Sequence, residues 1–151
     1  MVLRGKIRKI SQPTYAARYK GDIADNLIRW PDLEEIFLNI KFSNRGSTLI
    51  IAFAGELDHH FAEYARNKID SELLKATTKN VVFDFTGLSF MDSSGIGVIA
   101  GRYSNIIKLG GRTAIICKNP KICRILEISG ILKLMPVYEK LDYALKDLLS
   151  A

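Results

Sequence analysis

The sequence is poor in cysteine and has no long apolar run. Its two cysteines, Cys117 and Cys123, are too few for a disulfide scaffold, and they lack the close spacing and the histidine partners of a zinc site. The longest apolar run, LIIAFAG at residues 49–55, has the length of a strand and not of a membrane span. We therefore predict a protein without a membrane segment, a metal ion or another cofactor, and we expect Cys117 to be part of the core.

The net positive charge is also small outside the N-terminus, although the whole chain carries +6. Residues 1–32 hold seven basic and three acidic side chains, which leaves only +2 for the remaining 119 residues. Because those residues show no arginine stripe and no basic-aromatic surface, we predict no direct contact with nucleic acid. The N-terminus lacks the continuous apolar stretch of a secretory signal, so we predict a cytoplasmic location.

Residues 1–32 mix glycine, proline, serine and charges without a sustained period of 2 or 3.6 residues. This pattern predicts an extension with little structure of its own, or the product of a misplaced start codon. A basic arm that contacts a partner or a membrane is the alternative. The length and the regular pattern of the rest indicate one domain, which we assign to residues 33–151.

Strand and helix patterns alternate through this domain. A hairpin is predicted first, with its turn at SNRG (43–46). Apolar residues then recur at helical spacing, or form short continuous runs bounded by turn signals. The segments that follow are a helix at 60–75, a central strand at 80–85, a helix at 93–109, a strand at 112–117, a helix at 120–129, a strand at 134–138 and a helix at 140–149. The buried face of the helix at 93–109 is expected at Ile96, Ile99, Ala100, Tyr103, Ile106 and Ile107.

The resulting order, ββαβαβαβα, predicts an α/β fold with a mainly parallel sheet and one antiparallel edge strand. Ligands and partners of such sheets bind at the loops that follow the carboxyl ends of the strands. We place residues 85–97 in one of these loops.

This segment contains MDSSGIG, residues 91–97, at the start of a helix. Asp92 or Ser93 can cap the helix by accepting hydrogen bonds from its first N–H groups. Gly95 and Gly97 need another reason, because each costs about 0.5–1 kcal/mol in a helix relative to alanine. Either the helix packs tightly on the sheet, or another molecule approaches the bare backbone closely.

A hydroxyl at a helix N-terminus is suited to modification by phosphate. We expect free N–H donors and the positive end of the helix dipole to tolerate the added charge, so that the fold survives. A partner packed over the glycines would be repelled, since like charges about 5 Å apart at an effective dielectric constant of about 20 repel by ~3 kcal/mol. That repulsion would lower affinity by about 100-fold.

Four motifs together resemble one family. GELDHH (55–60), LSFMDSSGIGVIAGRY (88–103), GG (110–111) and SGILK (129–133) resemble the STAS-domain anti-sigma factor antagonists, and most of all their sporulation members. The resemblance spans residues 34–151. It implies the STAS fold, no catalysis by the antagonist itself, and a partner that is both an anti-sigma factor and a serine kinase.

The resemblance also implies roles for individual residues. Ser93 would be the phosphoacceptor: the unmodified protein would bind the kinase and free a sigma factor, phosphorylation of Ser93 would end that binding, and a serine phosphatase would reset the cycle. The partner-binding residues would be Asp58, Asp92, Ser94, Gly95, Ile96, Gly97 and Arg102. Ile96 stands where leucine is more usual, and the N-terminal leader departs from the family pattern.

Three other interpretations are open. A serine hydrolase would use His59 or His60 to activate Ser93, although the chain has no G-x-S-x-G motif; we favour a helix start with Asp58 as its N-cap. A metal site at Asp58, His59, His60 and Asp92 is disfavoured because adjacent side chains are expected to diverge. A STAS regulatory module of another stress-signalling complex is the third.

Overall fold

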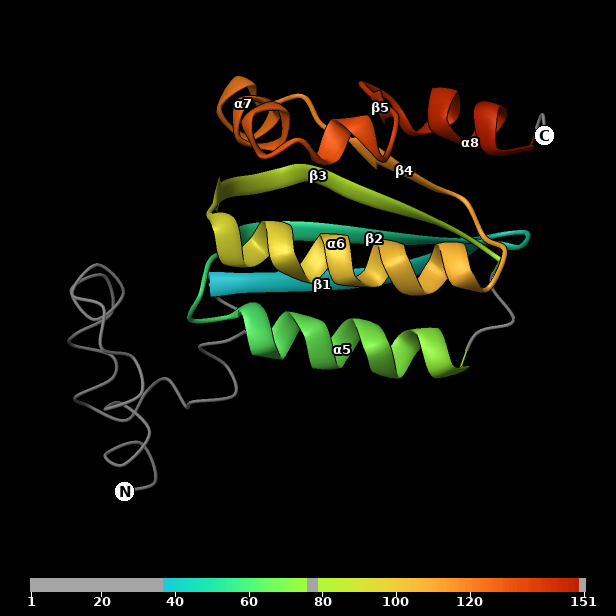
Figure 1. Cartoon of the computed structure of the whole chain (residues 1–151), viewed down its shortest axis with the longest axis horizontal. Coiled ribbons are helices and arrows are strands. Elements are labelled where there is room, and N and C mark those ends of the chain that lie inside the picture. The colour runs from blue at the N-terminus through green and yellow to red at the C-terminus, as the bar shows by residue number, and fades with distance from the viewer. Residues whose placement is uncertain (1–36, 76–78, 150–151) are drawn as a thin grey trace.

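The computed structural model describes residues 37–75 and 79–149 of the chain. The predicted extension over residues 1–32 lies outside these ranges. The described residues form one five-stranded sheet with the order β1-β2-β3-β4-β5 (Figure 1). β1 pairs with β2 antiparallel and the other neighbours pair in parallel, so the predicted mixed α/β sheet with an antiparallel edge strand is confirmed. The strands are β1 (Leu38–Arg45), β2 (Thr48–Leu57), β3 (Asn80–Met91), β4 (Thr113–Ile116) and β5 (Val137–Tyr138).

The hairpin between β1 and β2 is tighter than predicted. Arg45 pairs with Thr48, so only Gly46 and Ser47 form the turn. A two-residue hairpin turn needs positive φ, and Gly46 has a φ of 61°. The polar residues Ser43 and Asn44, predicted in the turn, belong to β1, where they pair with Ile50 and Leu49 and remain exposed at the edge of the sheet.

Four α-helices connect or follow the strands within the described ranges. They are α5 (Ala62–Lys75), α6 (Ser93–Lys108), α7 (Pro120–Ser129) and α8 (Leu141–Leu149). The predicted caps of α7 are confirmed: the Asn119 side chain accepts a hydrogen bond from the Lys121 N–H, and Gly130 ends the helix with a φ of 85°. A 3-10 helix, η1 (Ile131–Lys133), follows and was not predicted, because three residues are too few to show a period.

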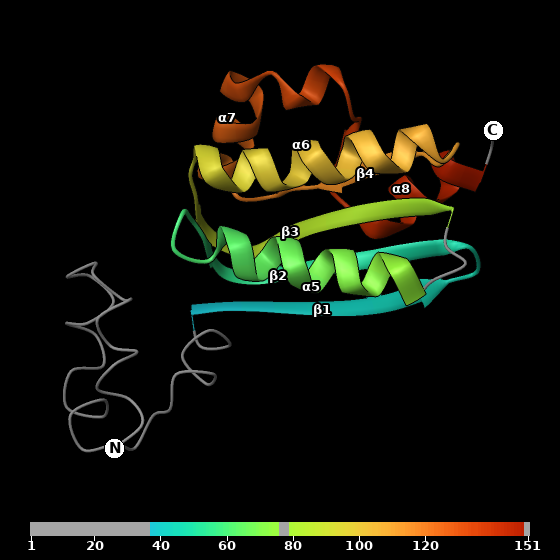
Figure 2. The same cartoon turned by 60° about the horizontal axis from the view of Figure 1, so that its bottom comes forward.

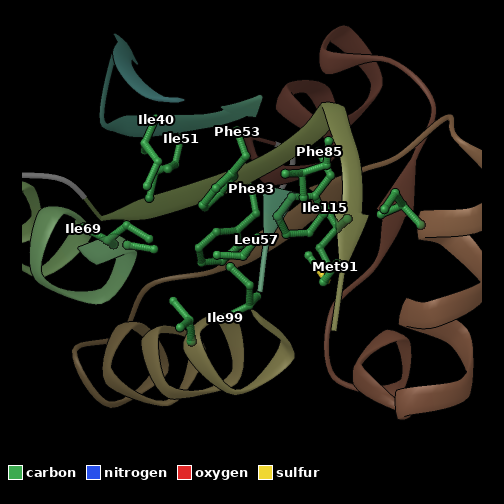
Figure 3. Close-up of a cluster of buried hydrophobic side chains, with 14 of the residues drawn as sticks. Ile40, Ile51, Phe53, Leu57, Ile69, Phe83, Phe85, Met91, Ile99 and Ile115 are labelled. Carbon is green, nitrogen blue, oxygen red and sulfur yellow. The ribbon is translucent and has the colours of Figure 1, made fainter. Parts of the chain in front are cut away.

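The helices cover the two faces of the sheet unequally. α5, α6 and α7 pack on one face, where the larger core cluster lies, whereas α8 packs on the other (Figure 2). In β3, Phe83 points into the larger cluster and the adjacent Val82 points toward α8. Both faces of this strand are therefore buried, as its continuous apolar sequence predicted. Figure 3 shows Phe83 among the buried side chains Ile51, Ile69 and Ile99.

β3 is longer than predicted. It continues to Met91, so most of the segment that we expected to be a loop is strand. The register against β2 shifts twice, between Ala52 and Ala54 and between Gly55 and Glu56, and β3 carries the additional residues. Such bulges interrupt the strict alternation of apolar and polar residues, so a strand that contains them cannot be predicted from that alternation.

The buried face of α6 is rotated relative to the predicted one. Ile99 and Ile106 are buried as expected, but Ile107 is 43% exposed. The buried stripe is completed by Gly95, Val98 and Arg102. Because Arg102 is charged, the hydropathy pattern did not indicate that it lies at the centre of the buried face.

The two cysteines carry free thiols. Cys117 lies in the core as predicted, and its burial, together with a hydrogen bond with Cys123, raises the pKa of the thiol to about 12. No helix among residues 37–75 and 79–149 combines the length and the apolar character needed to cross a membrane.

The hydroxyl of Tyr138 on β5 donates a hydrogen bond to the Asp147 carboxylate on α8. Desolvation, followed by this hydrogen bond and the negative charge of Asp147, raises the pKa of Tyr138 from 10.0 to about 12. The folded state thus favours the neutral phenol. The contribution of this phenol to the free energy of unfolding is fully present below pH 10 and is lost as the pH rises through 12.

Replacing Tyr138 with phenylalanine is expected to lower the free energy of unfolding by about 0.5–1 kcal/mol at pH 7, because one partly exposed hydrogen bond is removed. The difference between the two proteins should shrink as the pH approaches the pKa of the folded tyrosine. Urea unfolding at pH 7 and pH 11 measures both effects. A difference that stays constant over this range would contradict the assignment.

Candidate functional site

The carboxyl ends of β2 and β3 place two of the sequence motifs side by side. Leu57, the last residue of β2, pairs with Met91, the last residue of β3. The Asp92 N–H then donates to the Leu57 carbonyl at 3.3 Å. GELDHH and MDSSGIG therefore meet at one end of the sheet, because β2 and β3 run parallel and both end there.

Asp92 is the N-cap of α6, which decides between the two predicted capping residues. Its backbone is extended, and its Oδ1 accepts hydrogen bonds from the N–H groups of Ser94 at 2.9 Å and Gly95 at 3.3 Å. Its Oδ2 accepts from the His59 N–H at 3.2 Å. One carboxylate thus holds the start of α6 against the turn that follows β2.

Ser93 is the first residue of α6, and its side chain is exposed. The Asp92 carboxylate already accepts from the N–H groups of Ser94 and Gly95, so the expectation of free donors fails for these two groups. A phosphate on Ser93 would therefore lie beside an existing negative charge.

The two glycines of the motif have different surroundings. A Cβ on Gly95 would lie 2.8 Å from the carbonyl oxygen of Leu57 and 3.0 Å from Met91 Cγ, so this glycine allows α6 to pack on the strand ends. A Cβ on Gly97 would meet nothing within 4 Å, and Gly97 is exposed. Tight packing on the strand ends therefore explains Gly95, whereas the open surroundings of Gly97 leave room for another molecule.

Arg102 lies inside the interface between α5 and α6. Only 9% of the residue is exposed, and its Nε is 3.0 Å from Asp70 Oδ1 on α5. Asp70 was not among the predicted site residues, since an acidic residue on a solvated helix face carries no distinguishing signal. The ion pair joins the two helices and leaves little of the Arg102 side chain at the surface.

Asp58 is also buried, with 5% of the residue exposed. Its Oδ1 accepts from the His60 N–H at 2.9 Å, and its carbonyl accepts from the Phe61 N–H at 3.2 Å. Asp58 therefore shapes the turn before α5, and it is not the N-cap of that helix, which begins at Ala62.

The predicted contact residues thus divide into two groups. Asp58, Gly95 and Arg102 are buried, so they lie behind the surface and support it. The others reach solvent to different degrees at the start of α6: Asp92, Ser94, Ile96 and Gly97. Phe90, which is 47% exposed at the same end of β3, is a further contact candidate that was missed because we had placed it in a loop.

The two histidines each face a carboxylate. His59 Nδ1 is 3.5 Å from Asp92 Oδ2, and His60 Nδ1 is 3.6 Å from Asp58 Oδ2. Their ring centroids lie 4.0 Å apart, closer than expected for diverging side chains, but each ring faces a different carboxylate. These contacts favour a role in the turn and the cap over activation of Ser93. Among the described residues, no group of three or more histidine, cysteine or acidic side chains is arranged to hold a metal ion.

Known proteins are similar to this chain in sequence and in architecture. An anti-sigma F factor antagonist of Paenibacillus polymyxa is 39% identical over 111 residues, which are 74% of this chain and 95% of that protein. The structure of the anti-sigma factor antagonist SpoIIAA in its unphosphorylated form has a TM-score of 0.64 at 28% identity, covering 74% of this chain and 97% of that one. The structure of the Bacillus cell fate determinant SpoIIAA in the phosphorylated form has a TM-score of 0.57 at 29% identity, covering 72% and 97%.

The fold implied by the sequence resemblance is therefore confirmed. The sequence profile of the STAS domain matches residues 39–144, which include β2 to β5, all of β1 except Leu38, and both motifs of the site. The chain belongs to the STAS domain family.

Proposed function

We propose that this protein is an anti-sigma factor antagonist controlled by phosphorylation of Ser93. Its unmodified form binds an anti-sigma factor that is also a serine kinase, and this binding frees a sigma factor for sporulation transcription. The kinase phosphorylates Ser93 and is released, and a serine phosphatase restores the unmodified form. The protein acts by binding and not by catalysis, in the cytoplasm and without direct contact with nucleic acid.

The observation that supports this proposal most strongly is the position of Ser93. Its exposed hydroxyl is on the first residue of α6, one turn before the open backbone of Gly97. A kinase can therefore reach the hydroxyl without opening the core. A partner that packs against Gly97 lies close enough to respond to a charge at Ser93.

The charge already present at the site strengthens the proposed switch. Asp92 precedes Ser93, and its carboxylate is bound to backbone N–H groups in the first turn of α6. A phosphate would add about −1.5 to −2 to this charge. Because a partner would exclude water from the surface, a repulsion of ~3 kcal/mol per pair of like charges is expected there, equivalent to about 100-fold in affinity.

The fold should tolerate the modification. The exposed side chain of Ser93 can carry a phosphate in solvent, and the N-terminus of a helix favours negative charge. Asp92 retains its hydrogen bonds, so the helix start remains capped. Phosphorylation is therefore expected to change binding and not folding.

The proposed contact surface consists of the exposed start of α6. Ser94, Ile96 and Gly97 would contact the partner together with Asp92 and Ser93. Asp58, Gly95 and Arg102 would contribute indirectly, by holding the turn and the two helices in place.

Incubation with an anti-sigma factor kinase and ATP, followed by mass spectrometry of the peptides, tests the proposal. We expect one phosphate, on Ser93. The Ser93→Ala variant should remain unmodified, whereas the matched Ser94→Ala variant should still be phosphorylated. Phosphate on Ser94 in the wild-type protein, or none on either serine, would refute the assignment.

A further inference from the structure

The two long helices on one face of the sheet leave a groove at their carboxyl-terminal ends. Figures 1 and 2 show α5 and α6 side by side, and the groove lies where both helices end beside the start of β3. Its volume is about 460 Å³, which is within the range of small-molecule sites. The groove is at the end of α6 opposite to Ser93, about 20 Å along the helix axis.

The wall of the groove is mainly apolar. Its apolar side chains are Leu73, Leu74, Val81, Ile106 and Leu109. Leu74 is 89% exposed and Leu109 is 87% exposed. Single exposed leucines are ordinary on protein surfaces. Two that line the same concave, apolar surface provide the contacts that an apolar ligand requires.

Positive charge lies on this apolar wall. Lys79 and Lys108 line the groove together with one carboxylate, that of Asp70. Asp70 is paired with Arg102, whose Nε lies 3.0 Å from Asp70 Oδ1, so the guanidinium balances the negative charge of this carboxylate. The lining of the groove therefore has a net charge of +2 from the two lysines, which favours a ligand with a negative head group.

We propose that this groove binds a fatty acid anion of medium chain length. The apolar chain would lie against the leucines, and the carboxylate would lie near Lys79 and Lys108. The charge of the lining also argues against the chain's own N-terminal segment as the occupant, because residues 1–32 are strongly basic. Binding at this site does not require phosphorylation of Ser93.

The test uses the full chain, labelled with ¹⁵N, and sodium decanoate as the probe. Saturable chemical-shift changes are expected at the ends of α5 and α6, at decanoate concentrations below micelle formation. Decanol and decyltrimethylammonium, which share the chain but lack the negative charge, should bind about three- to tenfold more weakly, given the modest strength of partly exposed ion pairs.

Variants locate the binding site. Combining Lys79→Glu with Lys108→Glu should weaken decanoate binding by about tenfold or more, and Leu109→Asp should weaken it as well. Lys146→Glu on α8 is the control for a charge reversal away from the groove, since this exposed lysine lies on the other face of the sheet. All four positions are exposed, so the variants are expected to fold, and the spectra verify this.

Three results would overturn the proposal. These are equal affinity for decanoate and decanol, the same loss of affinity in the Lys146→Glu control, and binding to anionic phospholipid vesicles without saturable binding of decanoate. If Leu109→Asp perturbs the fold, the lysine variants alone decide.

Discussion

Substituting Ser93 with aspartate is expected to weaken binding to the anti-sigma factor kinase by about 100-fold, whereas Ser93→Ala should bind as tightly as the unmodified protein. The aspartate places a negative charge beside Asp92 at the exposed start of α6. In an interface that excludes water, such a charge is repelled by ~3 kcal/mol by a like charge about 5 Å away. Alanine removes only the hydroxyl. Calorimetric titration of each variant with the kinase measures the difference.

Ser104→Asp is the matched control for this experiment. Ser104 is an exposed serine of the same helix, three turns away from the site. Its substitution adds the same charge to α6 and should leave the affinity nearly unchanged. If the two aspartate variants lost affinity equally, the effect would come from the net charge of the protein and not from the site.

The second large effect is expected from the two glycines of the motif. Gly95→Ala should lower the free energy of unfolding by about 1–3 kcal/mol, because its Cβ would lie 2.8 Å from a backbone carbonyl that cannot move freely. Gly97→Ala has open space around it and should raise the stability by about 0.5–1 kcal/mol, since alanine favours the helix. Urea unfolding of both variants measures these opposite changes.

The affinity for the kinase provides a second test of Gly97. Gly97→Ala should reduce affinity for the kinase although it stabilises the fold, because the methyl group lies where a partner is proposed to approach the backbone. A Gly97→Ala protein that binds as tightly as the wild type would contradict the proposed contact. Loss of stability in this variant would show that the glycine has a structural role.

Most of the fold could be predicted because local signals were strong. The caps of α7 are a clear example: Asn119, Pro120 and Gly130 each have a conformational preference that the structure confirms. The order of strands and helices followed from spacing in the same way. The 3-10 helix and the bulged second half of β3 were missed, because their geometry depends on the neighbouring strand.

The site could be predicted in outline and not in its internal contacts. Pattern and capping rules indicated Asp92 and Ser93, and the parallel sheet brought GELD beside them. Whether Gly95 or Gly97 is packed depends on where the Leu57 carbonyl lies, which is a tertiary fact. The same limit applies to Arg102, whose burial depends on Asp70 of another helix.

The central claim is that negative charge on one exposed serine controls the binding of another protein. Titrating the kinase with unmodified protein and with protein phosphorylated only on Ser93 tests this most directly. We expect the phosphorylated form to bind at least about 100-fold more weakly, with an unchanged circular dichroism spectrum. Equal affinities of the two forms would contradict the account.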